Sequence, residues 1–304
     1  MYWYKVPFGK ENFGDALGPY IVEKLTGKEA IYTPLRHRGF NKRAILNYLR
    51  NIYNRNVSVR DVYYNIRFVL SRKQNLLLSI GSVMDLYSHP HCDIWGSGIM
   101  FIDNHIENAD FYAVRGKHSQ ARLRELGYKV PEYIGDPALL TPLMYTSKTE
   151  KKYAIGIIPH FLHYNETISK LNSDKILIIN LLDDIERVID DVHSCEKIVS
   201  SSLHGIIIAH AYGIPALWVW LSKGYIGGDD IKFADYFSSV ELKEYACFTI
   251  KSDFFDQNYI DEVELIFKTN KHLTLVDPKR LKELQIGLIK SAPFAILPQY
   301  KNFK

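Results

Sequence analysis

The chain has 304 residues, of which 47% are hydrophobic and 24% are charged, an ordinary globular composition that supplies a large core. The net charge is only +4, which gives no argument for a nucleic-acid partner, and no nucleic acid is expected. No run of about 18 apolar residues occurs, so the sequence predicts no membrane-spanning segment.

The first residues, MYWYKVPFGK, lack the apolar core of a secretory signal and instead predict a strand over 1–6. The cysteines are odd in number and scattered along the chain, as Cys92, Cys195 and Cys247. Sparse, scattered cysteines are typical of a reduced compartment. We therefore expect a cytoplasmic protein.

Apolar runs of strand length alternate with segments of helical period through the first half of the chain. A helix is predicted from Asp15 to Leu25, where Gly27 stops it, and a second helix over 117–127. Further strands are predicted at four places: 29–33, 75–82, 92–99 and 110–116.

The segment from Arg36 to Lys73 is strongly basic, with ten Lys or Arg residues against one acid, Asp61. This local excess of +9 leaves about −5 for the rest of the chain, and tyrosines are interleaved with the charges. The segment is expected to be helical and irregular. It suits an anionic surface, either lipid headgroups or phosphates, and equally a solvated basic face with tyrosines packed beneath.

After a short polar linker at 146–152, the alternation of strands and helices starts again. The last 30 or so residues are helical in pattern until Pro293 and Pro298 end it. Helices are predicted near Asn165, over 183–194 and after Ser200, and strands over 153–159, 175–180, 196–200 and 215–220.

Continuous apolar strands separated by helices predict parallel sheets that are buried on both faces. The sequence therefore predicts an α/β protein with two Rossmann-like domains whose parallel sheets face a central cleft. Residues 1–147 form the predicted N-terminal domain, with 36–73 as a basic insertion, and residues 148–275 form the C-terminal domain. The helical segment 276–304 is expected to pack back across both domains.

Ligands of open α/β sheets bind at the carboxyl ends of the strands, and this chain places small and reactive residues at those ends. Glycine and serine there are also ordinary turn residues. An arginine and two histidines at equivalent positions are harder to attribute to turns. The positions are Gly81–Ser82, Gly96–Gly98, Arg115, His160 and the run from Ser200 to His204.

The run SSSLHG, residues 200–205, lies where a buried strand becomes a buried helix. Serines at the start of a helix cap its free N–H groups, and those groups with the helix dipole also bind anions. His204 in the first turn would serve as a proton donor or acceptor near neutral pH. The alternative interpretation is a capped core helix with a satisfied histidine.

Metal and nucleotide motifs are poorly supported. HPHCD at 89–93 and HFLH at 160–163 have no partner set at a recognised spacing, so no required metal is expected. Neither a P-loop nor a G-x-G-x-x-G fingerprint occurs, and the G-x-S-x-G pattern of a Ser-His hydrolase is missing. Asp136, followed by proline, is interpreted as a structural turn.

Taken together, the motifs resemble the polysaccharide pyruvyl transferase family. The resemblance spans 12–240, and 36–73 and the C-terminal 60 or so residues lie outside it. It implies a fold like that of the two-domain GT-B glycosyltransferases, and transfer of pyruvate from phosphoenolpyruvate onto a sugar as a cyclic ketal, with release of phosphate. The matching motifs are NFGDAL (12–17), IWGSGI (94–99), AVRG (113–116), IGDPALLTP (134–142), IGIIPH (155–160), VSSSLHGIIIAHAYGIPALWV (199–219) and GDDIKFADYFSSV (228–240).

The resemblance also implies roles for individual residues, with the first domain on the acceptor side and the second on the donor side. His204 would move protons, and Asp15 would act on the acceptor hydroxyl, with Asn12 and Ser97 binding the acceptor. The donor would be held by Arg115, Ser201, Ser202, Leu203, Gly205, His160 and Lys232.

One position departs from the family. Some members carry arginine just before the Leu-His pair, where this chain has Ser202. The donor anion would therefore depend more on Arg115, Lys223 or Lys232. No cofactor and no metal are implied, because phosphoenolpyruvate is a co-substrate.

The expected acceptor is a lipid-linked or oligosaccharide precursor of a cell-surface polysaccharide. A protein that works on a lipid phosphate carrier would gain from resting its basic segment, 36–73, on the inner face of the membrane. Two other functions compete with this one. The first is a glycosyltransferase of the same fold that uses a nucleotide sugar, and the second is a non-catalytic protein that binds glycans or membranes.

Overall fold

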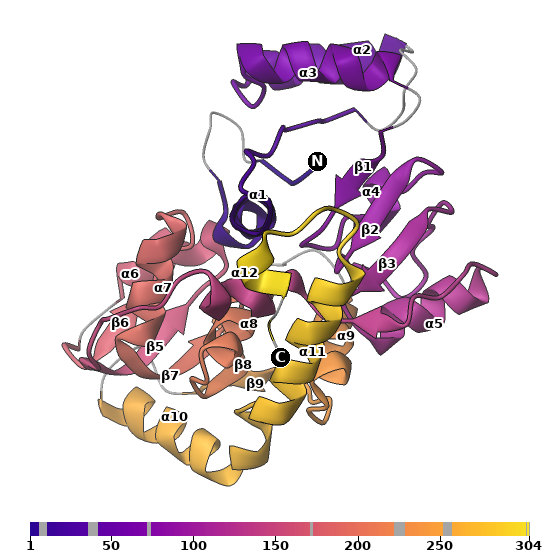
Figure 1. Cartoon of the computed structure of the whole chain (residues 1–304). Helices are drawn as coiled ribbons and strands as arrows, with labels where there is room; N and C mark the ends of the chain where they lie inside the picture. Colours follow the sequence, from indigo (N-terminus) through magenta and orange to yellow (C-terminus); the bar gives the residue numbers. More distant parts are fainter. Residues whose placement is uncertain are drawn as a thin grey trace.

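The structure, a computed structural model, describes residues 1–5, 11–35, 42–71, 74–170, 173–221, 229–251, 257–301 and 303 (Figure 1). Its strands form two parallel sheets, and helices surround and separate them. This arrangement confirms the predicted α/β class with two parallel sheets.

The first sheet has the strand order β1-β2-β3-β4, with every neighbouring pair parallel. Helix α5 (Lys117–Glu125) follows β3, and the short α4 (Met84–Tyr87) follows β1. The strands are β1 (Leu76–Leu78), β2 (Cys92–Trp95), β3 (Asp110–Val114) and β4 (Tyr133–Ile134).

The second sheet has the strand order β6-β5-β7-β8-β9, again with parallel neighbours. Its strands are β5 (Tyr153–Ile158), β6 (Ile176–Ile178), β7 (Cys195–Ser200), β8 (Ala216–Trp220) and β9 (Phe248–Thr249). The helices of this half are η3 (Phe161–His163), α6 (Tyr164–Ile168), α7 (Ile185–His193), α8 (Leu203–Ala211), α9 (Ile231–Val240), α10 (Gln257–Thr269) and η4 (Lys271–Leu273).

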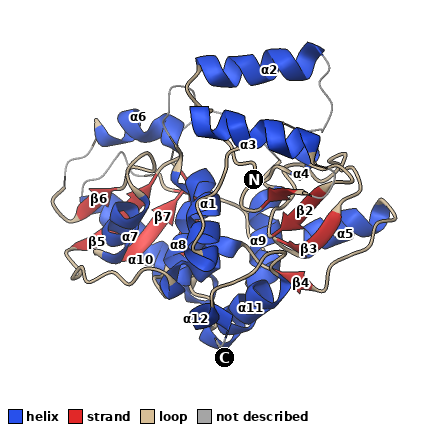
Figure 2. Cartoon of the chain, turned by 45° about the horizontal axis from the view of Figure 1, so that its top comes forward, coloured by secondary structure: helices blue, strands red, loops and turns tan. Residues whose placement is uncertain are grey.

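Helices from each half pack against the other half. Helix α1 (Phe13–Thr26) and the 3-10 helix η2 (Pro137–Leu143) share one hydrophobic core with α7 and α8. In the opposite direction, α9 packs on α5 beside the first sheet. Figure 2 shows α1, α8 and α9 between the two sheets. The central cleft therefore stays a prediction.

The C-terminal segment forms α11 (Pro278–Ser291) and α12 (Pro298–Lys301). Helix α11 contacts elements of both halves: the Trp95 indole N–H donates to the carbonyl of Leu288, and the Arg280 guanidinium donates to the carbonyl of Ser239. The boundaries at 147 and 275 stay predictions, although every strand of the first sheet precedes 147 and every strand of the second follows 148.

Two predicted strands of the first half are wrong. Of the strand expected over 1–6, the described residues form only an isolated bridge between Tyr2 and Leu78, and 29–33 form no strand. The two segments instead exchange a few hydrogen bonds, because the Met1 amino group donates to the Ile31 carbonyl and the Thr33 N–H donates back to Met1. These contacts are too few to make a regular ladder.

The described part of the basic segment forms two amphipathic helices, α2 (Lys42–Tyr53) and α3 (Val59–Leu70). Ser58 caps α3 in a reciprocal capping box with Asp61. Both views show the two helices together at one end of the molecule, outside the two sheets (Figures 1 and 2). Across the described residues, no helix has the length and apolar character needed to cross a membrane.

Candidate active site

The serines before α8 tie strand ends together instead of capping the helix. The Ser200 hydroxyl donates to the carbonyl of Ile158 and accepts from the N–H of Ser202, and the Ser201 hydroxyl accepts from the N–H of His160. Ser202 occupies the N-cap but makes no side-chain cap hydrogen bond, so that the capping role expected of these serines is wrong. The first-turn N–H groups of α8 are therefore left uncapped, as an anion site requires.

His204 lies in the first turn of α8 and is held between a glycine and a buried carboxylate. Its Nε2 lies 3.7 Å from Oδ2 of Asp136, and neither atom has a hydrogen-bond partner within the described structure. A Cβ atom on Gly14 would lie 2.1 Å from Nδ1 of His204, so only glycine allows this approach. The His204 side chain keeps 13% of its surface exposed, whereas that of Asp136 is fully buried.

Asp136 is the functional candidate that the sequence analysis missed. Its other oxygen, Oδ1, accepts from the N–H of Ala138 and starts η2, which is the turn role predicted from the sequence. Nothing local signals that Oδ2 faces a histidine 68 positions later in the chain. Asp136 therefore both starts η2 and directs a buried carboxylate oxygen at the imidazole of His204.

Asp15 lies in the first turn of α1, close to both His204 and the end of β1. Its Oδ2 accepts from the side-chain amide of Asn12 at 2.8 Å, and Oδ1 lies beside Gly81. Burial raises the pKa of Asp15 to about 6, against the lowering effects of the Asn12 hydrogen bond and of the electrostatic interaction with His204. A carboxyl group with this pKa can act as a base near neutral pH.

Lys232 in α9 interacts electrostatically with two other predicted donor residues, Arg115 and His160. Burial, and next the positive charge of Arg115, lower the pKa of Lys232. Burial, and next the positive charge of Lys232, lower the pKa of His160 to about 4, which leaves that imidazole neutral. Within the described residues Lys232 has no hydrogen-bonded or ion-paired partner, although its ammonium lies 5.5 Å from the ring centre of Phe233. An unpaired, partly buried cation beside a second cation favours an anionic ligand.

Arg115 lies at the end of β3, as predicted, but its guanidinium is 99% buried and already bonded. Nε donates to Oδ2 of Asp235 at 3.0 Å, Nη1 donates to the Ser82 hydroxyl at 2.7 Å, and Nη2 donates to the Ile99 carbonyl at 2.7 Å. Three of its five N–H groups are thus used, and two are left for a donor anion. A direct contact between Arg115 and the donor stays a prediction.

Two other predicted residues are placed less directly. Ser97 is fully buried, and its hydroxyl donates to the Gly81 carbonyl, so it supports the loop behind Asp15. Lys223 lies outside the described residues. Acceptor binding by Asn12 and Ser97 stays a prediction.

Among the described residues, no three His, Cys, Asp or Glu side chains form a group that would hold a metal ion. The rings of His160 and His163 lie 6.0 Å apart, and each Nδ1 is buried without a hydrogen-bond partner in the described structure. This pair lacks a third ligand, and the HFLH motif gains no support as a metal site from it.

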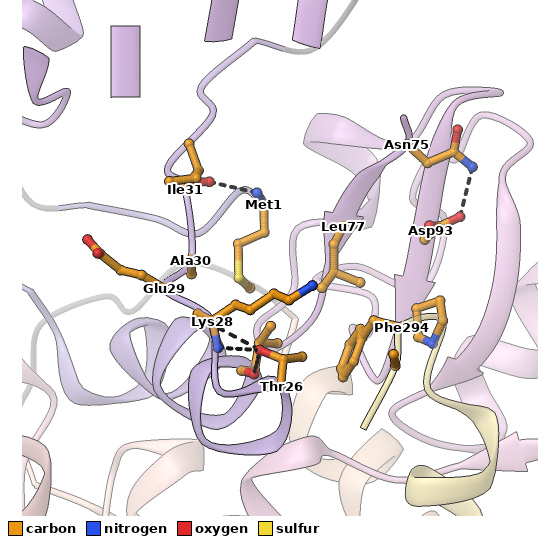
Figure 3. Close-up of a pocket in the computed structure, with 13 residues that line it drawn as sticks. Met1, Thr26, Lys28, Glu29, Ala30, Ile31, Asn75, Leu77, Asp93 and Phe294 are labelled. Atoms are coloured by element: carbon orange, nitrogen blue, oxygen red, sulfur yellow. Dashed lines mark hydrogen bonds between the residues drawn. The ribbon is translucent and has the colours of Figure 1, made fainter. Parts of the chain in front are cut away.

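Figure 3 shows a cavity of about 330 Å³ that lies away from these residues, at the opposite ends of β1 and β2. Two of its polar groups are already paired, since the Asn75 amide donates to Asp93 and the Met1 amino group donates to Ile31. None of the catalytic candidates lines this cavity.

Comparison with known proteins identifies the family of the chain. The family model of the polysaccharide pyruvyl transferases matches residues 43–223. The match covers Arg115, His160 and the SSSLHG run, and it includes most of the basic segment, which the motifs alone had left outside. The protein called Uncharacterized protein L143, of Acanthamoeba polyphaga mimivirus, is 31% identical over 241 residues, which are 74% of this chain and 81% of that protein.

The fold and the site define an α/β protein with two parallel sheets, in which His204 faces the buried carboxylate of Asp136 and Lys232 lies near the buried Arg115. The chain belongs to the polysaccharide pyruvyl transferase family. Its activity in general terms is the transfer of pyruvyl groups onto polysaccharide.

Proposed function

We propose that the donor is phosphoenolpyruvate and that the product is a cyclic pyruvate ketal on a sugar of a polysaccharide precursor. The observation that carries this proposal is Lys232, which has no paired partner within the described residues and lies near Arg115 and the neutral His160. The backbone N–H of His160 donates to the hydroxyl of Ser201, just before α8. Phosphoenolpyruvate bears a phosphate and a carboxylate on three carbons, and this cluster of cations and uncapped N–H groups is complementary to two adjacent anions.

The proposed reaction balances with two acceptor hydroxyls and no further reactant. One hydroxyl proton ends on the methylene carbon of the donor, which becomes the methyl group and makes C2 electrophilic. Two C–O bonds form at C2, the bond from C2 to the phosphate oxygen breaks, and the second proton leaves with phosphate. His204 delivers and removes protons, and Asp15 removes a proton from an attacking hydroxyl.

The acceptor is proposed to lie in a groove along α1. Two cavities, of about 330 and 600 Å³, share the lining residues Glu11, Ala16, Tyr20 and Ile185, and so form one groove that begins at the neighbours of Asp15. Its walls carry further carboxylates, among them Asp183 and Asp184. Carboxylate oxygens accept hydrogen bonds from sugar hydroxyls, and a groove this long has room for more than one sugar.

The direct test is phosphate release from phosphoenolpyruvate with lipid-linked acceptors that contain galactose, mannose or glucosamine. We expect release only with an acceptor present, together with a product heavier by one pyruvate less one water. Transfer of a sugar from a nucleotide sugar, with no turnover of phosphoenolpyruvate, would instead establish the glycosyltransferase alternative.

The acid limb of the pH profile is expected to report Asp15. The base must be ionised, so that kcat/KM should fall about tenfold for each pH unit below about 6. The negative charge of Glu11 raises the pKa of Asp15, and the Asn12 hydrogen bond lowers it. Glu11→Gln should therefore move the limb to lower pH, and Asn12→Ala should move it to higher pH.

The comparison of wild type with the two variants is the control. The donor phosphate also ionises at about pH 6, and it contributes equally to each profile. Only the displacement between profiles reports the enzyme. A limb at the same pH in wild type and in both variants would remove Asp15 from the role of base.

A further inference from the structure

The α2 and α3 helices present an unusually apolar outer surface. On α3 the exposed side chains Val59, Tyr63, Ile66 and Leu70 follow the spacing i, i+4, i+7 and i+11, so they form one stripe. Val59 is 90% exposed and Leu70 is 78% exposed. A stripe of this kind has a cost in water, and it marks an interaction surface.

Helix α2 carries a second stripe of the same kind. Its exposed apolar side chains recur at helical spacing on one face: Ile45, Leu46, Leu49, Ile52 and Tyr53. Tyr48, at the edge of this stripe, packs against the core that surrounds the first sheet. We refer to α2 and α3 with their two stripes as the helical hairpin.

Contacts between α3 and the body of the protein hold its apolar stripe on the outside. Phe68 is buried in the core of the first sheet, and the side chain of Asn65 donates to the carbonyl of Tyr32 and to the hydroxyl of Tyr48. Because these contacts fix the rotation of α3, its apolar stripe cannot turn inward.

Exposed arginines flank both stripes. Arg60 and Arg67 lie beside the α3 stripe, with their guanidinium groups 5.7 and 5.8 Å from the ring centres of Tyr64 and Tyr63. Arg50 and Arg55 are exposed at the end of α2 and after it. Asp61, the single acid of the segment, is occupied in the capping box. Basic residues beside an apolar and tyrosine-rich face are typical of helices that lie in the interface of an anionic bilayer.

The groove along α1 ends next to the helical hairpin. Its lining residues run from Glu11, near Asp15, to Ser58 and Asp61 at the start of α3. An acceptor held in the groove would therefore leave it beside the hairpin. We propose that the hairpin docks on an anionic membrane surface, with the stripes in the interface and the arginines on lipid phosphates. The docking itself does not depend on the proposed donor.

The test is sedimentation of the full chain with vesicles of phosphatidylcholine alone and of phosphatidylcholine mixed with phosphatidylglycerol. We expect binding to the anionic vesicles that weakens with salt, and a loss of about fivefold for each arginine removed in Arg50→Gln/Arg67→Gln. Leu46→Gln/Leu70→Gln should weaken binding as well. These leucines are exposed, and their replacement leaves the core intact.

Matched controls carry the same changes elsewhere on the surface. Arg124→Gln/Lys129→Gln removes the same charge, and Leu86→Gln/Leu265→Gln changes two other exposed leucines. Equal losses in hairpin and control variants, or no binding by wild type, would overturn the proposal. So would self-association that the hairpin leucines control in the absence of vesicles, since the surface would then bind a second copy. Turnover of a water-soluble acceptor should be equal in all variants, and its absence would count against the proposed function alone.

Discussion

Replacing His204 by glutamine is expected to lower turnover by about 10²–10⁴-fold, the range for removal of a general acid–base group. Glutamine keeps most of the volume and hydrogen-bonding capacity of the side chain but cannot take up or release a proton near neutral pH. The free energy of unfolding should change little, because Nε2 has no hydrogen-bond partner within the described residues that the substitution would remove. Turnover and chemical denaturation are measured on the same preparation.

The matched control is His193→Gln. His193 ends α7, is partly buried and, like His204, has a buried ring nitrogen without a hydrogen-bond partner in the described structure. It lies against Tyr212, away from the strand ends that form the candidate site. We expect this variant to keep wild-type turnover. Equal activity of the two variants would exclude His204 from proton transfer.

Asp136→Asn tests how His204 is held. The substitution keeps the volume and the oxygen that accepts from Ala138, so η2 should still form. It replaces the buried carboxylate oxygen that faces Nε2 of His204 at 3.7 Å. We expect slower turnover with a nearly unchanged free energy of unfolding. A purely structural role for Asp136 would lower stability and leave the turnover of the folded enzyme unchanged.

Local pattern was enough to predict most of the sheets. Seven of the described strands, β1 to β3 and β5 to β8, fall within predicted apolar runs, because a parallel strand covered on both faces needs apolar side chains at every position. The two-residue strands β4 and β9 are too short to leave a pattern. The segment 29–33 has a strand-like composition, but its neighbours decide its conformation.

The site was predicted only in part, because its geometry depends on residues far apart in the chain. Asp15 and His204 stand out in the sequence because each lies at the start of a predicted helix, and the family resemblance gave them their roles. The structure places them near each other through Gly14. The partners of the site carry no local signal. Asp235 lies 120 positions from Arg115, and Asp136 shows only its capping role in sequence. Burial and charge at such positions follow from packing, which a single sequence does not display.

The ion pair between Arg115 and Asp235 is expected to be the most costly interaction to break. Both side chains are almost fully buried, and Asp235 also accepts from the N–H and the hydroxyl of Ser119. Space for the pair is made by two glycines, because a Cβ on Gly98 would lie 2.3 Å from Arg115, and one on Gly116 would lie 1.7 Å from the Asp235 carbonyl oxygen. The ion pair joins Asp235 in α9, which belongs to the second half, to Arg115 at the end of β3.

Asp235→Ala should therefore lower the free energy of unfolding by about 3–5 kcal/mol, because it leaves the Arg115 charge buried without its counter-ion. The double variant Arg115→Met/Asp235→Leu removes both charges and should regain most of that loss. Chemical denaturation of Arg115→Met, of Asp235→Leu and of the double variant gives the coupling energy. Additive losses would show that the two side chains do not depend on each other.

A Lys232 variant helps to separate the structural role of Arg115 from its role in donor binding. Lys232 lies near Arg115 but takes no part in the ion pair with Asp235. Lys232→Gln should leave stability nearly unchanged and raise KM for phosphoenolpyruvate by about 10-fold to 100-fold, the value of a lost hydrogen bond to a charged group. If the double variant folds well and still binds the donor as tightly as wild type, Arg115 only joins the two halves. If it folds well but has lost donor affinity, the two remaining N–H groups of Arg115 bind the donor. Arg115 would then both hold α9 against the first sheet and bind the donor.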